Sequence, residues 1–165
     1  MDQKITQQRT TGTARLLEAR QHVLGDLVNA PHRSERVAET DGVVYINDSK
    51  ATFLDATLRS MAEIQAPLVW ITGALPDDHG TEGVAAYLLE RVKAVVHFGA
   101  TDGSSSGPFG EDLYQADDLR TAVFVAHELA LPGDVVLFSP ACPSGNGFAN
   151  YEERGHAFKQ AVRDL

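Results

Sequence analysis

The sequence predicts an α/β domain: a Rossmann-like, three-layer domain with a mostly parallel sheet and an N-terminal β-hairpin. Three continuous apolar runs, PLVWIT, AVVHFGA and DVVLFSP, alternate with loops and helical patterns. Apolar strands of this kind are typical of parallel sheets whose two faces are both covered by helices. Asp41-Gly42 stands between the β-rich runs RVAET and VVYIN, and this pattern predicts a two-residue hairpin turn.

The other elements follow in order along the chain. Residues 1–11 are predicted to be a flexible polar arm, and residues 12–165 a single domain. Apolar residues at helical spacing predict a helix from about Ala14 to Val28. Pro31 ends this pattern, because proline disfavours helix in the residue before it. Further helices are expected around residues 55–64, 84–91, 117–130 and 152–162, a short strand at LYQA, and a Gly/Ser/Pro loop over 101–111.

Composition narrows the classes of function. The chain has 165 residues, 43% hydrophobic and 22% charged, which is typical of one globular domain. Its net charge of −9 would repel a phosphate backbone, so no nucleic-acid partner is expected. The apolar runs are of strand length, the N-terminus is polar, and the one cysteine, Cys142, can form no internal disulfide. We therefore expect a cytoplasmic protein without membrane contact.

The segment DSKAT follows the second strand of the hairpin. Ligands of open parallel sheets bind at the carboxyl ends of the strands, which is where this loop is expected. Asp48, Lys50 and Thr52 put a carboxylate, an ammonium group and a hydroxyl at a strand-to-helix junction, where the helix dipole favours anions. The alternative is simple helix capping by Ser49, Thr52 or Asp55.

Two other segments carry candidate binding groups. Arg33 could contact a phosphate or a ribose, and the alternative is a surface ion pair with Glu35 or another acidic neighbour. The run 139–144, SPACPS, follows the last apolar strand, where backbone N–H groups could hold an anion. The alternative for this run is a tight connection fixed by its prolines. Cys142 is expected to be a small buried residue rather than a nucleophile.

The loop GALPDDHG contains Asp77, Asp78 and His79, and we expect a solvated acidic loop there rather than a metal site. The six histidines are scattered along the chain, so no metal site is predicted from protein ligands alone. The patterns G-x-x-x-x-G-K-[ST] and G-x-G-x-x-G are both absent from the sequence. A P-loop phosphate site and a dinucleotide-binding role are therefore not expected of this chain.

Three segments, PHRSERVAETDGVVYINDSKAT, PLVWITG and VVLFSPACPSGNGFANYEERGHAFKQAV, together resemble the C-terminal domain of the Mur ligase family. The likeness runs from about Leu16 to Leu165 and is strongest to the members that add D-glutamate. Such ligases have a UDP-sugar domain, a central P-loop domain and a last domain that closes over ATP and brings in the amino acid. The resemblance implies that ATP and Mg²⁺ act only in the complete ligase, with the missing ligase domains as partners.

The same resemblance implies roles for individual residues. Arg33 would contact a phosphate of ATP, and Asp48 would contact the ribose. His79 stands nearest to the position where the family carries a lysine, and Phe53 stands where the family carries an asparagine. The residues implied to hold D-glutamate are Lys50, Thr52, Ser144 and Tyr151, together with His79.

The resemblance leaves two interpretations of function. The first is the C-terminal domain of an ATP-dependent ligase of peptidoglycan synthesis, which joins D-glutamate to UDP-N-acetylmuramoyl-L-alanine and is not active alone. The alternative is a stand-alone, non-catalytic binding or regulatory module derived from a Mur ligase, which the Met1 start and the absent lysine favour. An isolated domain could also form a homodimer, because the surface that normally faces the central domain would be exposed.

Overall fold

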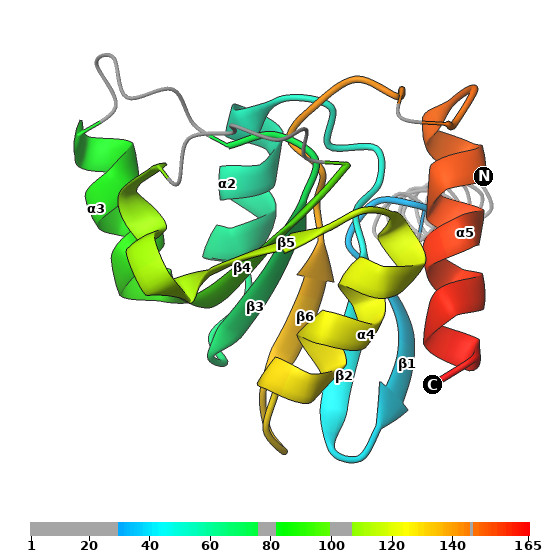
Figure 1. Ribbon diagram of the computed structural model, residues 1–165, viewed down its shortest axis with the longest axis horizontal. Coiled ribbons are helices and arrows are strands. Elements are labelled where there is room, and N and C mark those ends of the chain that lie inside the picture. Colours follow the sequence, from blue (N-terminus) through cyan, green and yellow to red (C-terminus); the bar gives the residue numbers. More distant parts are fainter. Residues whose placement is uncertain (1–29, 76–81, 100–106, 146) are drawn as a thin grey trace, which may run out of the picture. The chain divides into compact units, whose positions relative to one another are not determined.

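In the described part of the chain, six strands form one sheet (Figure 1). The computed structural model describes residues 30–75, 82–99, 107–145 and 147–165, and His32–Leu165 forms one compact unit. The strand order is β1-β2-β6-β3-β4-β5, and every neighbouring pair is parallel except β1 with β2. The predicted α/β class and mostly parallel sheet are confirmed. The strands are β1 (Glu35–Thr40), β2 (Val43–Asn47), β3 (Leu68–Thr72), β4 (Val92–Phe98), β5 (Leu113–Ala116) and β6 (Val135–Phe138).

The first two strands form the predicted N-terminal hairpin, with Thr40 paired to Val43 across a two-residue turn. Asp41 and Gly42 fill that turn with φ values of 52° and 78°. Two successive positive φ values suit the right-handed twist of a hairpin, and Asp-Gly adopts them at low steric cost. The second strand of the hairpin ends at Asn47, directly before the DSKAT segment.

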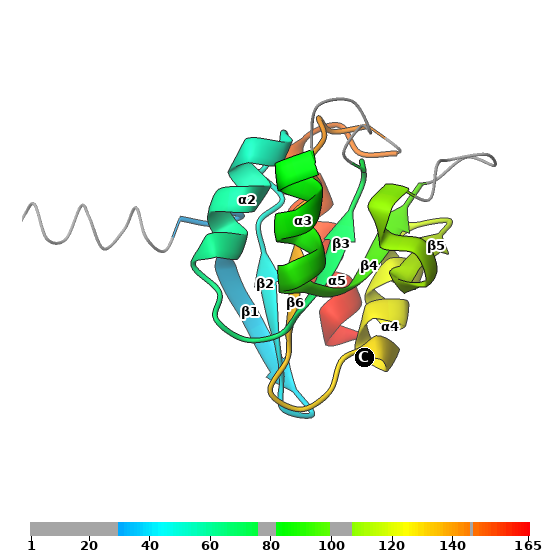
Figure 2. The same ribbon diagram turned by 90° about the vertical axis from the view of Figure 1, so that its left-hand side faces the viewer.

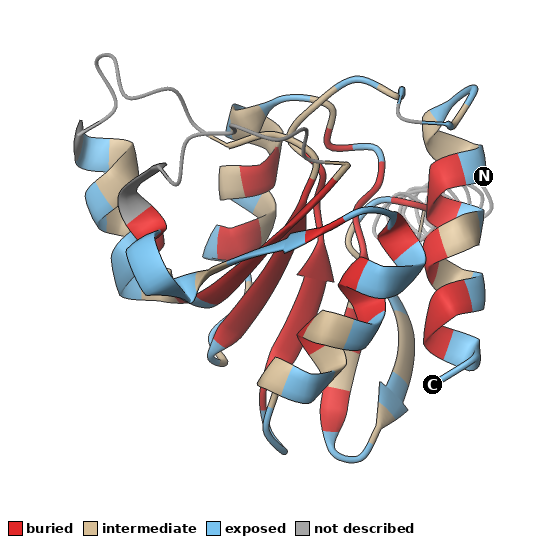
Figure 3. Ribbon diagram, in the orientation of Figure 1, coloured by how far each residue is buried: buried red, intermediate tan, exposed pale blue. Residues whose placement is uncertain are grey.

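Helices cover both faces of the sheet and make three layers (Figure 2). Helices α4 and α5 pack on one face through residues such as Val123 and Phe158, whereas α2 and α3 pack on the other through Met61 and Leu88. The central strands between the two layers are almost wholly buried (Figure 3). The helices are α2 (Leu54–Ala62), α3 (Glu82–Arg91), α4 (Leu119–Leu129) and α5 (Tyr151–Arg163), with a 3-10 segment η1 (Gly107–Asp112).

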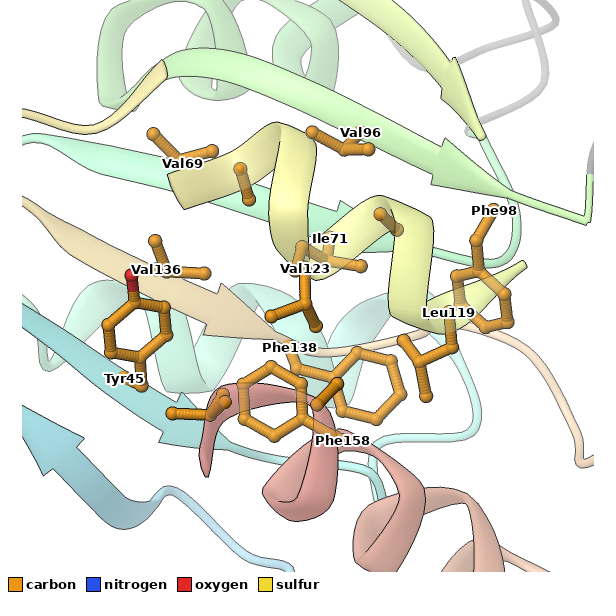
Figure 4. Packing of buried hydrophobic residues seen from close by; sticks show 14 of the residues in the cluster. Tyr45, Val69, Ile71, Val96, Phe98, Leu119, Val123, Val136, Phe138 and Phe158 are labelled. Atoms are coloured by element: carbon orange, nitrogen blue, oxygen red, sulfur yellow. The ribbon is translucent and has the colours of Figure 1, made fainter. Parts of the chain in front are cut away.

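Aromatic packing fixes α5 to the sheet near its carboxyl edge. The ring of Phe138, the last residue of β6, stacks on Phe158 of α5 with centroids 4.8 Å apart (Figure 4). On the opposite face Trp70 is fully buried, and its indole N–H donates to the carbonyl of Ser139 at 2.7 Å. Both contacts hold the end of β6, so the loop that follows this strand leaves from a rigid point.

One predicted loop is partly wrong, and several predictions lie outside the described residues. Residues 107–111 of the expected loop belong to η1, because Phe109 is buried and packs edge-on to Trp70 at 6.3 Å. The polar arm, the helix at 14–28 and the domain boundary at residue 12 fall outside the described ranges and stay predictions. Among the described helices none is both long and apolar enough to cross a membrane.

Candidate functional site

Asp48 follows β2 and is the centre of a buried hydrogen-bond network. One carboxylate oxygen accepts from the Ser34 N–H at 3.1 Å, and the other accepts from the hydroxyls of Ser60 at 2.7 Å and Ser139 at 2.9 Å. The residue is 3% exposed. Burial raises the pKa of Asp48 above its ordinary value, although these hydrogen bonds and the nearby Arg33 charge act in the opposite direction. Asp48 thus ties the turn before β1 to α2 and to the end of β6.

Arg33 is held out to solvent between two residues with left-handed backbones. His32 has φ 64° and Ser34 has φ 43°, values that are costly for residues other than glycine. Hydrogen bonds hold the His32 backbone, since its N–H donates to Glu35 at 2.9 Å and its carbonyl accepts from the Lys50 N–H at 3.1 Å. With Ser34 held by Asp48, the guanidinium of Arg33 is exposed on a rigid turn.

The ring of His32 is buried against α5. Its Nδ1 lies 3.0 Å from the Asn47 side-chain amide, which makes Nδ1 an acceptor and leaves the proton on Nε2. Burial lowers the pKa of His32, and the Lys159 charge acts in the same direction. Glu35 does not pair with Arg33, because its two oxygens accept from Lys159 at 2.9 and 3.1 Å. The alternative of an Arg33–Glu35 ion pair is therefore wrong among the described contacts.

The Ser49–Thr52 loop connects β2 to α2 and carries the exposed side chain of Lys50. The capping alternative for this loop is wrong, because the N-cap of α2 is Phe53 and makes no side-chain hydrogen bond. Ser49 is fully buried, and its hydroxyl donates to the Tyr151 carbonyl of α5 at 2.9 Å. Thr52 is half-buried at the start of the helix, next to backbone N–H groups that no side chain caps.

The loop after β6 lies beside the Ser49–Thr52 loop. The N–H of Ala141 donates to the carbonyl of Ala51 at 3.1 Å, which joins the two loops directly. Arg154 of α5, 1% exposed, adds a second connection through the carbonyls of Ser49, Cys142 and Pro143. Ser144, which is half-buried, directly follows Pro143 and therefore lies at the same carboxyl edge of the sheet as Lys50.

Tyr151 is the first residue of α5 and contacts the Ser49–Thr52 loop and the ring of His32. The Lys50 ammonium lies 5.3 Å from the centre of the Tyr151 ring, a cation–π distance, and the same ring meets His32 edge-on at 6.1 Å. The helix begins with a side-chain cap, since Asn150 accepts from the Glu153 N–H at 2.8 Å and Glu153 accepts from the Ala149 N–H at 2.7 Å. This cap fixes the position of Tyr151 at the first turn.

Neither a metal centre nor an activated thiol is found in the described part of the chain. Among the residues described, no group of three His, Cys, Asp or Glu side chains could hold a metal ion. Burial raises the pKa of the half-buried Cys142 thiol, so it lacks the thiolate character of a nucleophilic cysteine. Cationic side chains, hydroxyls and backbone N–H groups lie at the carboxyl edge of the sheet, and such groups bind carboxylate or phosphate oxygens.

Most of the segments that form this site match a known protein family. The family model described as "Mur ligase, glutamate ligase domain" matches residues 32–142, more than half of the chain. The chain belongs to this Mur ligase family. The match begins at His32, where the compact unit begins, and covers the loops that carry Arg33 and Lys50.

Named relatives of this Mur ligase domain are much longer proteins. UDP-N-acetylmuramoylalanine--D-glutamate ligase of Christiangramia forsetii is 37% identical over 81% of this chain and 31% of its own length. The enzyme of that name from Pelotomaculum thermopropionicum is 40% identical over 81% of this chain and 30% of its own length. The one from Chlamydia felis is 37% identical over 90% and 36%. The chain thus spans about a third of the length of these relatives.

Two solved structures share a weaker likeness. A bifunctional folylpolyglutamate synthase/dihydrofolate synthase from Yersinia pestis, complexed with AMPPNP and Mn ion, is 25% identical with a TM-score of 0.49. MurF ligase from Thermotoga maritima, in complex with ADP, is 17% identical with a TM-score of 0.45. Each match covers 82% of this chain and 32% of the other. Nucleotides are thus bound in the structures of these two proteins.

The structure brings most of the predicted site residues to one edge of this Mur ligase domain. Arg33, Lys50, Thr52, Ser144 and Tyr151 come from segments joined by the contacts above, whereas His79 lies outside the described residues and stays a prediction. Sequence analysis missed Arg154, although the NYEERG segment contains it. A polar helix face gives no signal that one of its arginines is buried.

Proposed function

We propose that this chain is the C-terminal domain of an ATP-dependent ligase that joins D-glutamate to UDP-N-acetylmuramoyl-L-alanine. The observation that carries the proposal is the joining of the loops of Arg33, Lys50 and Ser144 at the carboxyl edge of the sheet. The names of the relatives at 37–40% identity support D-glutamate as the amino acid. The domain supplies one wall of the site, and the complete enzyme supplies the rest.

The amino-acid side of the proposed site suits a ligand with two carboxylates. An exposed ammonium from Lys50 and hydroxyls from Thr52 and Ser144 offer charge-assisted and neutral hydrogen bonds to carboxylate oxygens. The Tyr151 ring under the Lys50 ammonium limits the directions in which this flexible side chain points. We propose that Lys50, Thr52, Ser144 and Tyr151 hold D-glutamate. His79 would add to this group, and its contribution rests on the family resemblance alone.

The nucleotide side rests on Arg33. Its exposed guanidinium, presented on a rigid turn, fits a phosphate oxygen of ATP. Asp48 fits the proposed ribose contact poorly, because it is buried and its oxygens already accept three hydrogen bonds. We propose instead that Asp48 holds the turn that presents Arg33. ATP supplies the phosphoryl group that activates a carboxylate, and Mg²⁺ would enter with its phosphates in the complete ligase.

The chain by itself is proposed to bind these ligands weakly and to catalyse nothing. Positioning and charge stabilisation dominate phosphoryl transfer, and they require groups on both sides of the reacting atoms. A single wall offers only part of those contacts. A dissociation constant near 1 mM, which corresponds to about 4 kcal/mol, is a reasonable scale for such a half-site.

The test is a heteronuclear NMR titration of the chain with D-glutamate and, separately, with Mg·ATP. We expect D-glutamate to shift the amides of Lys50, Thr52, Ser144 and Tyr151, and Mg·ATP to shift those around Arg33. Lys50→Met should abolish the D-glutamate response, whereas Arg120→Met, which removes a cation 77% exposed on α4, should leave it unchanged. L-Glutamate serves as the stereochemical control. A folded chain that responds to neither ligand would overturn the proposal and favour the non-catalytic module.

A further inference from the structure

Arg154 is a buried guanidinium with an unusual set of partners. Its two terminal nitrogens donate to the carbonyls of Ser49 at 2.9 Å, Pro143 at 3.1 Å and Cys142 at 3.2 Å. Within the described residues no carboxylate pairs with it, and its Nε has no acceptor. A buried cation without a counter-charge is costly, and burial lowers the pKa of Arg154 accordingly. Packing alone does not explain an arginine here, because an apolar side chain would fill the space without that cost.

What Arg154 achieves is a connection between two loops. Ser49 belongs to the loop after β2, whereas Cys142 and Pro143 belong to the loop after β6. A guanidinium presents its donors in a fixed planar fork, so it sets the spacing and the angle between the carbonyls that it binds. An ammonium group has one nitrogen and cannot reproduce that geometry.

The peptide planes held by Arg154 also orient the groups that follow them. The Ser49–Lys50 peptide is fixed from both sides, because its carbonyl accepts from Arg154 and its N–H donates to His32 at 3.1 Å. The Pro143–Ser144 peptide is trans, so its N–H points away from the carbonyl that Arg154 binds. Arg154 thereby holds the backbone directly before Lys50 and directly before Ser144.

We propose that Arg154 is a positioning residue that sets the distance between the Ser49–Thr52 loop and the Cys142–Ser144 segment, so that Lys50 and Ser144 act on one carboxylate-bearing amino acid. This inference deepens the proposed function and rests on it. Arg154 does not touch the ligand itself. The turn of Arg33 shares one hydrogen bond with the Ser49–Lys50 peptide and is also held through Glu35 and Asp48, so the nucleotide side should depend on Arg154 much less than the amino-acid side does.

The experiment compares the chain with its Arg154→Lys and Arg154→Met variants by NMR. Backbone carbonyl shifts of Ser49, Cys142 and Pro143 are first measured without ligand, and D-glutamate and Mg·ATP are then titrated separately. Arg163→Met, an exposed position on α5, is the matched control. We expect both Arg154 variants to move the three carbonyl shifts and to bind D-glutamate about tenfold more weakly, with Mg·ATP affinity unchanged within about twofold. The control should match the parent chain in every measurement.

The outcomes separate this inference from the proposed function. A folded Arg154→Met or Arg154→Lys variant with unchanged carbonyl shifts, or with unchanged D-glutamate affinity, overturns the positioning role. If both variants fail to fold, Arg154 serves stability alone and the inference is also overturned. If the parent chain itself ignores D-glutamate, the proposed amino-acid site fails and the ligand part of this inference fails with it. The ligand-free carbonyl shifts still decide whether Arg154 orders the two loops.

Discussion

Gly155 of α5 lies so close to the ring of His32 that no side chain larger than hydrogen fits between them. A Cβ built on Gly155 would overlap with His32 Nδ1 and with the hydroxyl of Ser49, both on buried residues. Glycine in a helix interior ordinarily costs about 1 kcal/mol relative to alanine. Here the close approach of two loops to the helix explains the residue.

Gly155→Ala is therefore expected to destabilise the domain despite its better helix propensity. Overpacking a rigid site costs about 1–3 kcal/mol, which outweighs the propensity gain. Urea unfolding measures the difference. Gly83→Ala in α3 is the control, because nothing lies within 4 Å of the added Cβ and its stability should be unchanged or slightly higher. A stabilised Gly155→Ala variant would show that the helix can move away from His32.

Asp48→Asn should destabilise the domain by about 1–3 kcal/mol, although the two side chains have the same shape. Both carboxylate oxygens of Asp48 accept hydrogen bonds, and an amide nitrogen cannot accept. At least one buried donor then loses its partner. The exposed Asp117→Asn is the comparison for loss of charge alone, and equal free energies of unfolding for the two variants would contradict the network.

Lys159→Met should cost about 1–3 kcal/mol, because it removes a partner of a partly buried carboxylate. The side chains of Lys159 and Glu35 are 19% and 25% exposed. Arg36 and Glu39, at 63% and 53%, form an ion pair in solvent, so Arg36→Met should change stability by less than about 0.5 kcal/mol. Chemical unfolding of both variants measures the two losses of stability. Similar losses in unfolding free energy would mean that burial does not strengthen the Lys159–Glu35 ion pair.

Phe53→Ser should stabilise α2 by about 0.5–1 kcal/mol. Phe53 occupies the N-cap, makes no capping hydrogen bond and is 57% exposed, so little packing is lost when serine provides the missing acceptor. Asn150→Ala, which removes an existing N-cap hydrogen bond of α5, should destabilise the domain by about 1 kcal/mol. Thermal unfolding measures both. A destabilised Phe53→Ser variant would indicate that the aromatic ring packs against a neighbour.

Stability should fall as the pH drops below about 6.5, and His32 should account for part of the fall. Burial holds the folded pKa of His32 below its ordinary value of 6.5, so the unfolded chain takes up the proton first. The stabilisation from neutral His32 is present above that value and is lost between it and the folded pKa. Unfolding free energies measured from pH 8 to pH 5 should change less in His32→Gln than in the parent chain. Parallel curves would rule out a contribution from His32.

Local signals in the sequence were sufficient for most of the fold. Continuous apolar runs predicted β3, β4 and β6, and Asp41-Gly42 predicted the hairpin, because each depends on neighbours in the chain. The helix expected to begin at residue 117 or 118 begins at Leu119, with Asp118 as the N-cap accepting from the Thr121 N–H at 2.8 Å. Residues 107–112 were missed because their helical turns depend on the burial of Phe109 against Trp70, a contact far away in the sequence.

The interior of the candidate site was not predictable in the same way. Motifs indicated Arg33, Lys50 and Ser144, which are exposed or half-buried and carry recognisable chemistry. The contacts that hold them join residues far apart, such as Asp48 with Ser139, which are 91 positions apart. Glu35 likewise pairs with Lys159, 124 positions away, rather than with Arg33, two positions away, which spacing along the chain suggested. Such partners follow from the topology, which spacing along the chain does not reveal.

The long reach of Arg154 has a consequence for the order in which this protein matures. It binds Ser49 across 105 positions, and Gly155 packs against His32 across a similar separation, so both loops lack these contacts until α5 has been synthesised. A nascent chain that has already formed the hairpin and β3 still lacks an ordered candidate site at the carboxyl edge of the sheet. Contacts of such sequence separation form late, because a long loop must close before they contribute. Proteolytic loss of the last helix would therefore disrupt the proposed ligand site in a chain whose strands are all present.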